Sequence, residues 1–151
     1  LQSFWRSAKH ALVVIEPGTP EGFARIHAAR NILAEAGAEI AAPCPHSGAC
    51  PMAAPDWCHF GQRLPRSRDH MRAKAARLPF EDEKFSYVVA IRDVWLRAPE
   101  PRIIDRPKAE KSGMNFRLCG ETGLSERRVL KRDKPAYRAV RHRKWGDTLA
   151  S

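Results

Sequence analysis

Apolar residues change their spacing near the start of the chain. Residues 11–15 (ALVVI) form a continuous apolar run rich in β-branched side chains, which predicts a buried strand of a parallel sheet. Thr19 then fits the N-cap of a helix and Gly37 its stop, and the apolar positions between them follow helical spacing, at Phe23, Ile26, Ala29, Ile32, Leu33 and Ala36. With a second short strand over residues 38–42, the pattern predicts a βαβ unit, whose ligands gather at the carboxyl ends of its strands.

The rest of the sequence predicts shorter helices and strands. Residues 66–77 (RSRDHMRAKAAR) contain no Gly or Pro and predict a helix with basic side chains on most of its circumference. Residues 85–91 (FSYVVAI) are the clearest strand. Short strands are expected over residues 102–104, 114–119 and 124–130, with the last two joined as a hairpin, and a short helix is expected over residues 136–144. The expected fold class is therefore α/β.

Positive charge accumulates toward the C-terminus. The formal net charge is +10, and residues 1–58 hold four basic and five acidic side chains, whereas residues 102–151 hold fourteen and six. The gradient suits contact with the phosphates and shape of RNA, although a merely solvated basic surface is the plain alternative. The candidate RNA-binding residues are Arg63, Arg66, Arg68, Arg72, Lys74, Arg77, Arg127, Arg128, Lys131, Arg132, Arg138, Arg141, Arg143 and Lys144, with Tyr137 and Trp145 interleaved for stacking.

Three of the four cysteines lie in one segment, CPHSGACPMAAPDWC, as Cys44, Cys50 and Cys58. Nothing in the sequence indicates secretion, so metal binding is favoured over disulfides, and Cys119 from the later hairpin can complete a set of four ligands. Zinc accepts four thiolates but usually shows close C-x2–4-C pairs, which this sequence lacks. Iron–sulfur clusters also take four thiolates and tolerate wider spacings, while four unlinked thiols are the plain alternative.

Two histidines lie beside these cysteines. His46 and His59 have the chemistry to replace a thiol in a zinc site or a mixed cluster, but a lone histidine next to a metal loop is more often a hydrogen-bonding neighbour. We interpret both histidines in that way.

The segment EPGTPEG at residues 16–22 superficially resembles a glycine-rich cofactor loop. The second glycine of that pattern is missing and Pro20 has no N–H to offer, so a strand-to-helix turn is the favoured interpretation. Glu16 and Thr19 stay weak candidates for cofactor contact, because they would face whatever binds above the sheet. The sequence contains no nucleophile elbow, no obvious carboxylate pair and no long apolar run, so it predicts no catalytic residue and no membrane partner.

Several stretches of the sequence together resemble a known family. They are LVVIEPGTPEGF, CPHSGACP, WCHFGQR with EDEKFSYVVAIR, and AYRAVRHRKWGD, in this order over nearly the whole chain. In these motifs the chain resembles the methyltransferase-like proteins of the small ribosomal subunit, which act as ribosome assembly factors in bacteria and mitochondria.

The resemblance implies a specific fold and cofactor. Residues 1–101 would be the later half of a Rossmann-like class I methyltransferase sheet with an inserted cysteine-rich metal loop at residues 43–62, and residues 102–151 a basic β-hairpin and helix tail. A [4Fe-4S] cluster would be held by Cys44, Cys50, Cys58 and Cys119. S-adenosylmethionine would bind only with the N-terminal half of the fold, which carries the family's glycine-rich loop.

The resemblance also implies partners and a location. The partners would be small-subunit ribosomal RNA, ribosomal proteins and the N-terminal half of the same fold, in the bacterial cytoplasm or, in a eukaryote, the mitochondrial matrix. Two other functions stay open: an active S-adenosylmethionine-dependent rRNA methyltransferase, and a zinc-stabilised RNA-binding module.

Overall fold

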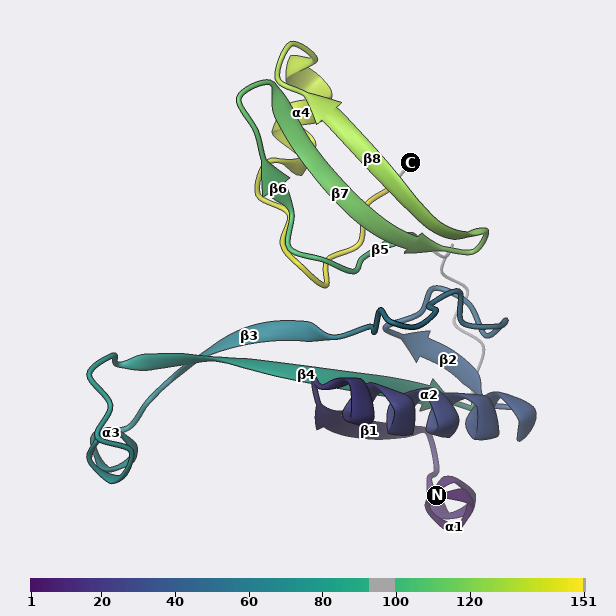
Figure 1. Cartoon of the computed structure of the whole chain (residues 1–151). Coiled ribbons are helices and arrows are strands. Elements are labelled where there is room, and N and C mark those ends of the chain that lie inside the picture. Colours follow the sequence, from purple (N-terminus) through teal and green to yellow (C-terminus); the bar gives the residue numbers. More distant parts are fainter. Residues whose placement is uncertain (93–99, 151) are drawn as a thin grey trace.

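Two antiparallel sheets, each packed against helices, make up the molecule (Figure 1). The computed structural model describes residues 1–92 and 100–150. We call these two ranges the N-terminal lobe and the C-terminal lobe. The elements are α1 (Gln2–Ser7), β1 (Ala11–Pro17), α2 (Pro20–Glu35), β2 (Glu39–Ala42), β3 (Phe60–Pro65), α3 (Arg68–Ala73), β4 (Phe80–Ile91), β5 (Arg102–Ile103), β6 (Lys108–Ala109), β7 (Gly113–Gly120), β8 (Gly123–Leu130) and α4 (Lys134–Val140).

The first sheet has β4 at its centre. β1 pairs antiparallel with one side of β4, and β2 pairs antiparallel with the other side. The predicted strand, helix and strand are therefore present and the two strands run in the same direction, but the prediction of a parallel sheet is wrong because β4 lies between them. The prediction that residues 11–15 are buried is also wrong, since Val13 is 53% and Ile15 64% exposed on the face away from α2.

α2 covers the opposite face of this sheet. The Thr19 side chain accepts a hydrogen bond from the Gly22 N–H at 3.1 Å, and Gly37 follows the helix with a φ of +79°, so the predicted start and stop are confirmed. The buried core beneath the helix consists of Trp5, Ile26, Leu33, Ala38, Ile40, Val88 and Ala90. Residues 16–22 are thus a capped strand-to-helix turn.

Removing this cap has a predictable cost. Thr19→Ala is expected to lower the free energy of unfolding by about 1 kcal/mol, because the Gly22 N–H loses its acceptor. Thr19→Ser keeps a hydroxyl at the same position and is the matched control, expected to stay close to the wild type. Urea denaturation measures both variants, and an equal loss in the two would show that the hydroxyl is not what stabilises this turn.

β3 and the first half of β4 leave the sheet as a two-stranded arm, with α3 at its far end (Figure 1). We call residues 60–85 the arm. A helix was predicted over residues 66–77, and α3 is shorter because Ala75 has a φ of +48°, which a continuing helix does not allow. The strand β3 has only weak sequence signals and was not predicted; neither were α1 and β6.

The second sheet is built around β7. β7 and β8 form the predicted hairpin, with Gly113 opposite Leu130 and Gly120 opposite Gly123, while β5 and β6 pair with the other side of β7. α4 starts earlier than predicted because the Asp133 side chain caps it by accepting from the Ala136 N–H at 3.2 Å, and it ends earlier than predicted, at Val140. The core of this lobe consists of Ile103, Met114, Phe116, Leu118, Val129, Val140 and Leu149.

The fold class is mixed α/β with antiparallel sheets. That the fold is Rossmann-like stays a prediction, and so does the domain boundary at residue 101. None of the helices in the described ranges combines the length and apolar character that a membrane crossing needs.

Candidate metal centre between the two lobes

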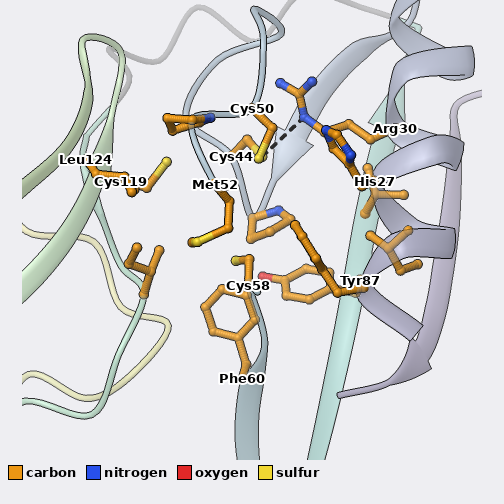
Figure 2. Close-up of a pocket in the computed structure, with 16 residues that line it drawn as sticks. His27, Arg30, Cys44, Cys50, Met52, Cys58, Phe60, Tyr87, Cys119 and Leu124 are labelled. Atoms are coloured by element: carbon orange, nitrogen blue, oxygen red, sulfur yellow. Dashed lines mark hydrogen bonds between the residues drawn. The ribbon is translucent and has the colours of Figure 1, made fainter. Parts of the chain in front are cut away.

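The cysteine segment forms an irregular loop between the lobes. We call residues 43–59 the cysteine loop; it follows β2 and faces the β7–β8 hairpin (Figure 1). Cys44, Cys50 and Cys58 of this loop and Cys119 of β7 all line one pocket, and Figure 2 shows the four side chains around the same space. The structure therefore brings together four thiols that are up to 75 residues apart in the sequence.

The rest of the pocket is largely apolar. Met52 and Phe60 line it beside the cysteines, with Leu124 on the side of the C-terminal lobe and Tyr87 on that of the first sheet (Figure 2). All four cysteines are free thiols. An apolar surrounding limits the access of water, which is one of the factors that set the stability and potential of a metal–thiolate centre.

Arg30 fastens the cysteine loop to α2. Its Nε donates to the Sγ of Cys44 at 3.3 Å, and its Nη2 donates to the carbonyl oxygens of His46, at 3.0 Å, and Gly48. Arg30 is only 4% exposed, and no carboxylate pairs with it in the described part of the chain. A buried cation is costly without a negative partner, so Arg30 would favour a metal-bound thiolate at Cys44.

Further hydrogen bonds fix the C-terminal end of the loop to β4 and to the turn between β1 and α2. The Ser86 hydroxyl donates to the Cys58 carbonyl at 2.8 Å, and the Trp57 Nε1–H donates to the Gly18 carbonyl at 3.1 Å. Ser86 is 1% exposed, so this hydrogen bond is shielded from water. Together with Arg30, these contacts hold Cys44 and Cys58 in place relative to α2 and β4.

Two arginines connect the loop to the C-terminal lobe. Arg102 of β5 donates to the Pro43 carbonyl at 2.9 Å and to the Gly146 carbonyl at 2.8 Å. Arg117 of β7 forms an ion pair with Asp56. Because β7 also carries Cys119, these contacts set the position of the fourth thiol relative to the other three.

The surroundings of the thiols determine their protonation. Burial raises the pKa of the Cys44 thiol, and the Arg30 guanidinium opposes this effect. Burial and then the other cysteines raise the pKa of Cys58, and burial raises the pKa of Cys119 to about 11. Without a cation the pocket keeps these thiols protonated, so a metal must displace their protons when it binds.

The four thiols supply a donor set that both zinc sites and iron–sulfur clusters use. Zinc binds thiolates at about 2.3 Å, which requires sulfur atoms within about 4 Å of one another. In residues 1–92 and 100–150, no three Cys, His, Asp or Glu side chains lie close enough to hold one metal ion. A polynuclear iron–sulfur cluster takes four thiolates around a larger core, and the donor set of this pocket matches that requirement.

The two histidines of the region differ in their surroundings. His59 Nδ1 lies 3.2 Å from the Trp57 carbonyl, and its ring stacks on Trp57. His46 has a buried Nε2 without a hydrogen-bond partner, and burial lowers the pKa of its imidazole. His59 is therefore a hydrogen-bonding neighbour, as interpreted from the sequence, while His46 holds no such bond at Nε2.

The weak cofactor candidates have structural roles. Glu16 accepts a hydrogen bond from Arg25 at 2.9 Å, and Thr19 caps α2. Neither lines the cysteine pocket. Arg30, Arg102 and Arg117 were not singled out from the sequence, although Arg30 follows Ile26 by four residues and precedes Leu33 by three, so that an arginine stands on the apolar stripe of the helix.

The basic residues proposed for RNA form two groups that lie far apart (Figure 1). One group is on the arm, and the other is on β8, α4 and the turns beside α4. Several of these side chains also have acidic partners. The ion pairs are Arg63 with Asp82 at 2.7 Å, Arg66 and Lys74 with Glu81 at 2.8 and 3.6 Å, Arg72 with Asp69 at 3.8 Å, and Arg128 with Glu110 at 3.0 Å.

The aromatic residues expected to stack on bases are used inside the molecule. Trp145 packs edge-on against His59, with ring centroids 4.9 Å apart, and also contacts Phe60. Tyr137 is half-buried against the core of the C-terminal lobe. Both side chains are partly buried by these contacts, and stacking of either ring on RNA stays a prediction.

Comparison with known proteins identifies similar chains. A family model described as "Mitochondrial small ribosomal subunit Rsm22" matches residues 1–150. The human mitochondrial ribosome assembly protein METTL17 is 28% identical over 167 residues, which cover 99% of this chain and 34% of that protein. Two mitochondrial Rsm22-cox11 tandem proteins of Schizosaccharomyces pombe are 27% identical over 194 residues, covering 97% of this chain and 26% of each relative. The chain thus spans about a third or less of the length of these relatives.

Proposed function

Because the chain belongs to the Rsm22 family of mitochondrial small ribosomal subunit proteins, we propose that it is the cluster-bearing, RNA-binding part of a ribosome assembly factor. Cys44, Cys50, Cys58 and Cys119 hold a [4Fe-4S] cluster, and the basic residues of the arm and of the C-terminal lobe contact small-subunit ribosomal RNA. The role of the cluster is structural: it joins the cysteine loop to β7 and so sets the position of the two lobes.

The single observation that carries this proposal is the convergence of the four cysteines on one pocket at the junction of the lobes. Three come from one loop and the fourth from another sheet, so a bound cluster connects segments that otherwise meet only through side-chain contacts. Arg30 and Arg102 bring positive charge to the same place, which favours the negative charge of a four-thiolate centre.

The proposed partners and location follow from the relatives. METTL17 is named a mitochondrial ribosome assembly protein, and the Rsm22-cox11 proteins are also named mitochondrial. We place this protein with ribosomal RNA and ribosomal proteins of the small subunit, in the mitochondrial matrix if it is eukaryotic and in the cytoplasm if it is bacterial. S-adenosylmethionine binding and methyl transfer would require the N-terminal half of the family's Rossmann-like fold, and we assign no catalytic residue in this chain.

Metal analysis of the protein purified without oxygen tests the cluster. We expect a brown protein with a broad visible absorption near 400 nm, about four iron atoms and four acid-labile sulfides per chain, and little zinc. Zinc without sulfide would replace the cluster by a zinc site and keep the RNA-binding surface. A protein without metal would overturn the proposal for the four cysteines.

A further inference from the structure

Most of the arm projects beyond the rest of the first sheet. β1 pairs with β4 only from residue 85 onward, so within residues 1–92 and 100–150 no third strand lies beside residues 80–84 of β4 and the matching part of β3. Strands of six residues reach about 20 Å. The arm therefore projects from the sheet as a free two-stranded ribbon that ends in α3 (Figure 1).

A free two-stranded ribbon is only marginally stable in water. Here charged side chains strengthen it: Arg63 forms two hydrogen bonds with Asp82 and lies over the Phe80 ring, 4.0 Å from the centroid. Arg66 and Lys74 both meet Glu81, which ties α3 to the end of β4. These contacts keep the arm extended and hold its end in one conformation.

The same charges make the arm a poor partner for another strand. Charged residues along an exposed edge discourage further strands from pairing with it, and both strands of the arm carry them. Its far end is instead strongly basic, with five basic and one acidic side chains in residues 66–79. Arg68, Arg72 and Arg77 are exposed there, and only Arg72 has an acidic neighbour, the exposed Asp69 at 3.8 Å.

We infer that the arm is a separate RNA-binding element, which reaches into a recess of folded ribosomal RNA and contacts phosphates through Arg68, Arg72 and Arg77. This inference rests on the proposed RNA binding and adds to it that the arm recognises folded RNA, by fitting between its helices, and not single strands. A thin basic projection fits between RNA helices whose phosphates surround it, whereas a flat surface such as that of α4 and β8 meets RNA from one side.

Charge removal on the arm tests this inference. In the 151-residue chain, the triple variant Arg68→Gln, Arg72→Gln, Arg77→Gln is compared with a control that loses the same charge elsewhere in the N-terminal lobe, Arg6→Gln, Lys9→Gln, Arg25→Gln. The probes are the folded, full-length small-subunit ribosomal RNA transcript and single-stranded poly(U), titrated at several salt concentrations. Circular dichroism and iron content show whether each variant keeps its fold and its metal.

We expect the arm variant to bind the folded transcript about 10- to 100-fold more weakly at about 0.1 M salt, with the salt slope reduced by about 3, since each lost phosphate contact removes nearly one released counterion. The control variant should lose much less affinity for the transcript. Both variants should weaken the binding of poly(U) to a similar extent. Equal losses for the two variants on the transcript, or an arm effect as large on poly(U), would overturn the inference while leaving RNA binding intact.

Other outcomes separate the two proposals. If the wild-type chain does not bind the transcript at all, the RNA-binding part of the proposed function fails and the inference fails with it. If the arm variant binds the transcript normally but no longer binds isolated small subunits, the arm contacts a ribosomal protein and its assignment to RNA is wrong.

Discussion

The Cys119→Ser variant is expected to lose most of its iron and sulfide and to unfold at a temperature lower by about 10 °C or more. Cys119 is the only one of the four cysteines that the C-terminal lobe supplies, so its loss would remove a proposed ligand and the link that the cluster makes between the lobes, leaving only the contacts of Arg102 and Arg117. A metal centre that binds only the folded chain contributes its binding free energy to stability. In a chain of this size about 1 kcal/mol corresponds to 2–4 °C.

The matched control is Met52→Leu, because Met52 lines the same pocket but is not a proposed ligand. This exchange conserves volume and should keep the cluster and change the melting temperature by only a few degrees. Iron, sulfide and visible absorption are measured on both variants, and gel filtration verifies that Cys119→Ser is still folded. A folded Cys119→Ser protein with the full complement of iron and sulfide would contradict the assignment of Cys119 as a ligand.

Local signals in the sequence predict the local elements well. Thr19 and Gly37 mark the ends of α2 because capping depends on neighbouring backbone groups, and residues 119–123 mark the β7–β8 turn for the same reason. The length of α3 was overestimated because propensity alone does not reveal that residues 66–79 must turn the chain back toward β4.

Pairing over long distances was harder to predict. β4 lies between β1 and β2 in the sheet, although it follows β2 by about 40 residues in the sequence. An apolar run such as residues 11–15 has the same pattern in a parallel and in an antiparallel sheet, so it does not predict the direction of its neighbours. Contacts between the two lobes also join residues far apart in the sequence, so they were equally hard to predict. The sequence placed Cys119 with the other cysteines by counting thiols and by the family resemblance, because no local pattern shows that β7 faces the cysteine loop.

Replacing Arg30 is expected to have the second largest effect on stability and iron content, after the loss of Cys119. Arg30→Met should lower the free energy of unfolding by about 3–5 kcal/mol and reduce the iron bound per chain, because the carbonyl oxygens of His46 and Gly48 lose their donor and Cys44 loses its cation. Denaturation in urea and iron analysis of the same samples measure both effects.

Arg25→Met is the control on the same helix. Arg25 pairs with Glu16 at the surface, where its side chain is 58% exposed, so this replacement should change the free energy of unfolding little and leave the iron content unchanged. Arg30→Lys keeps the positive charge but loses the forked set of guanidinium donors. Compared with Arg30→Met, it should restore part of the bound iron and a smaller part of the lost stability. If Arg30→Met matches Arg25→Met in both measurements, the cysteine loop does not depend on Arg30, and the organisation of the metal centre must come from the contacts of Ser86, Arg102 and Arg117 instead.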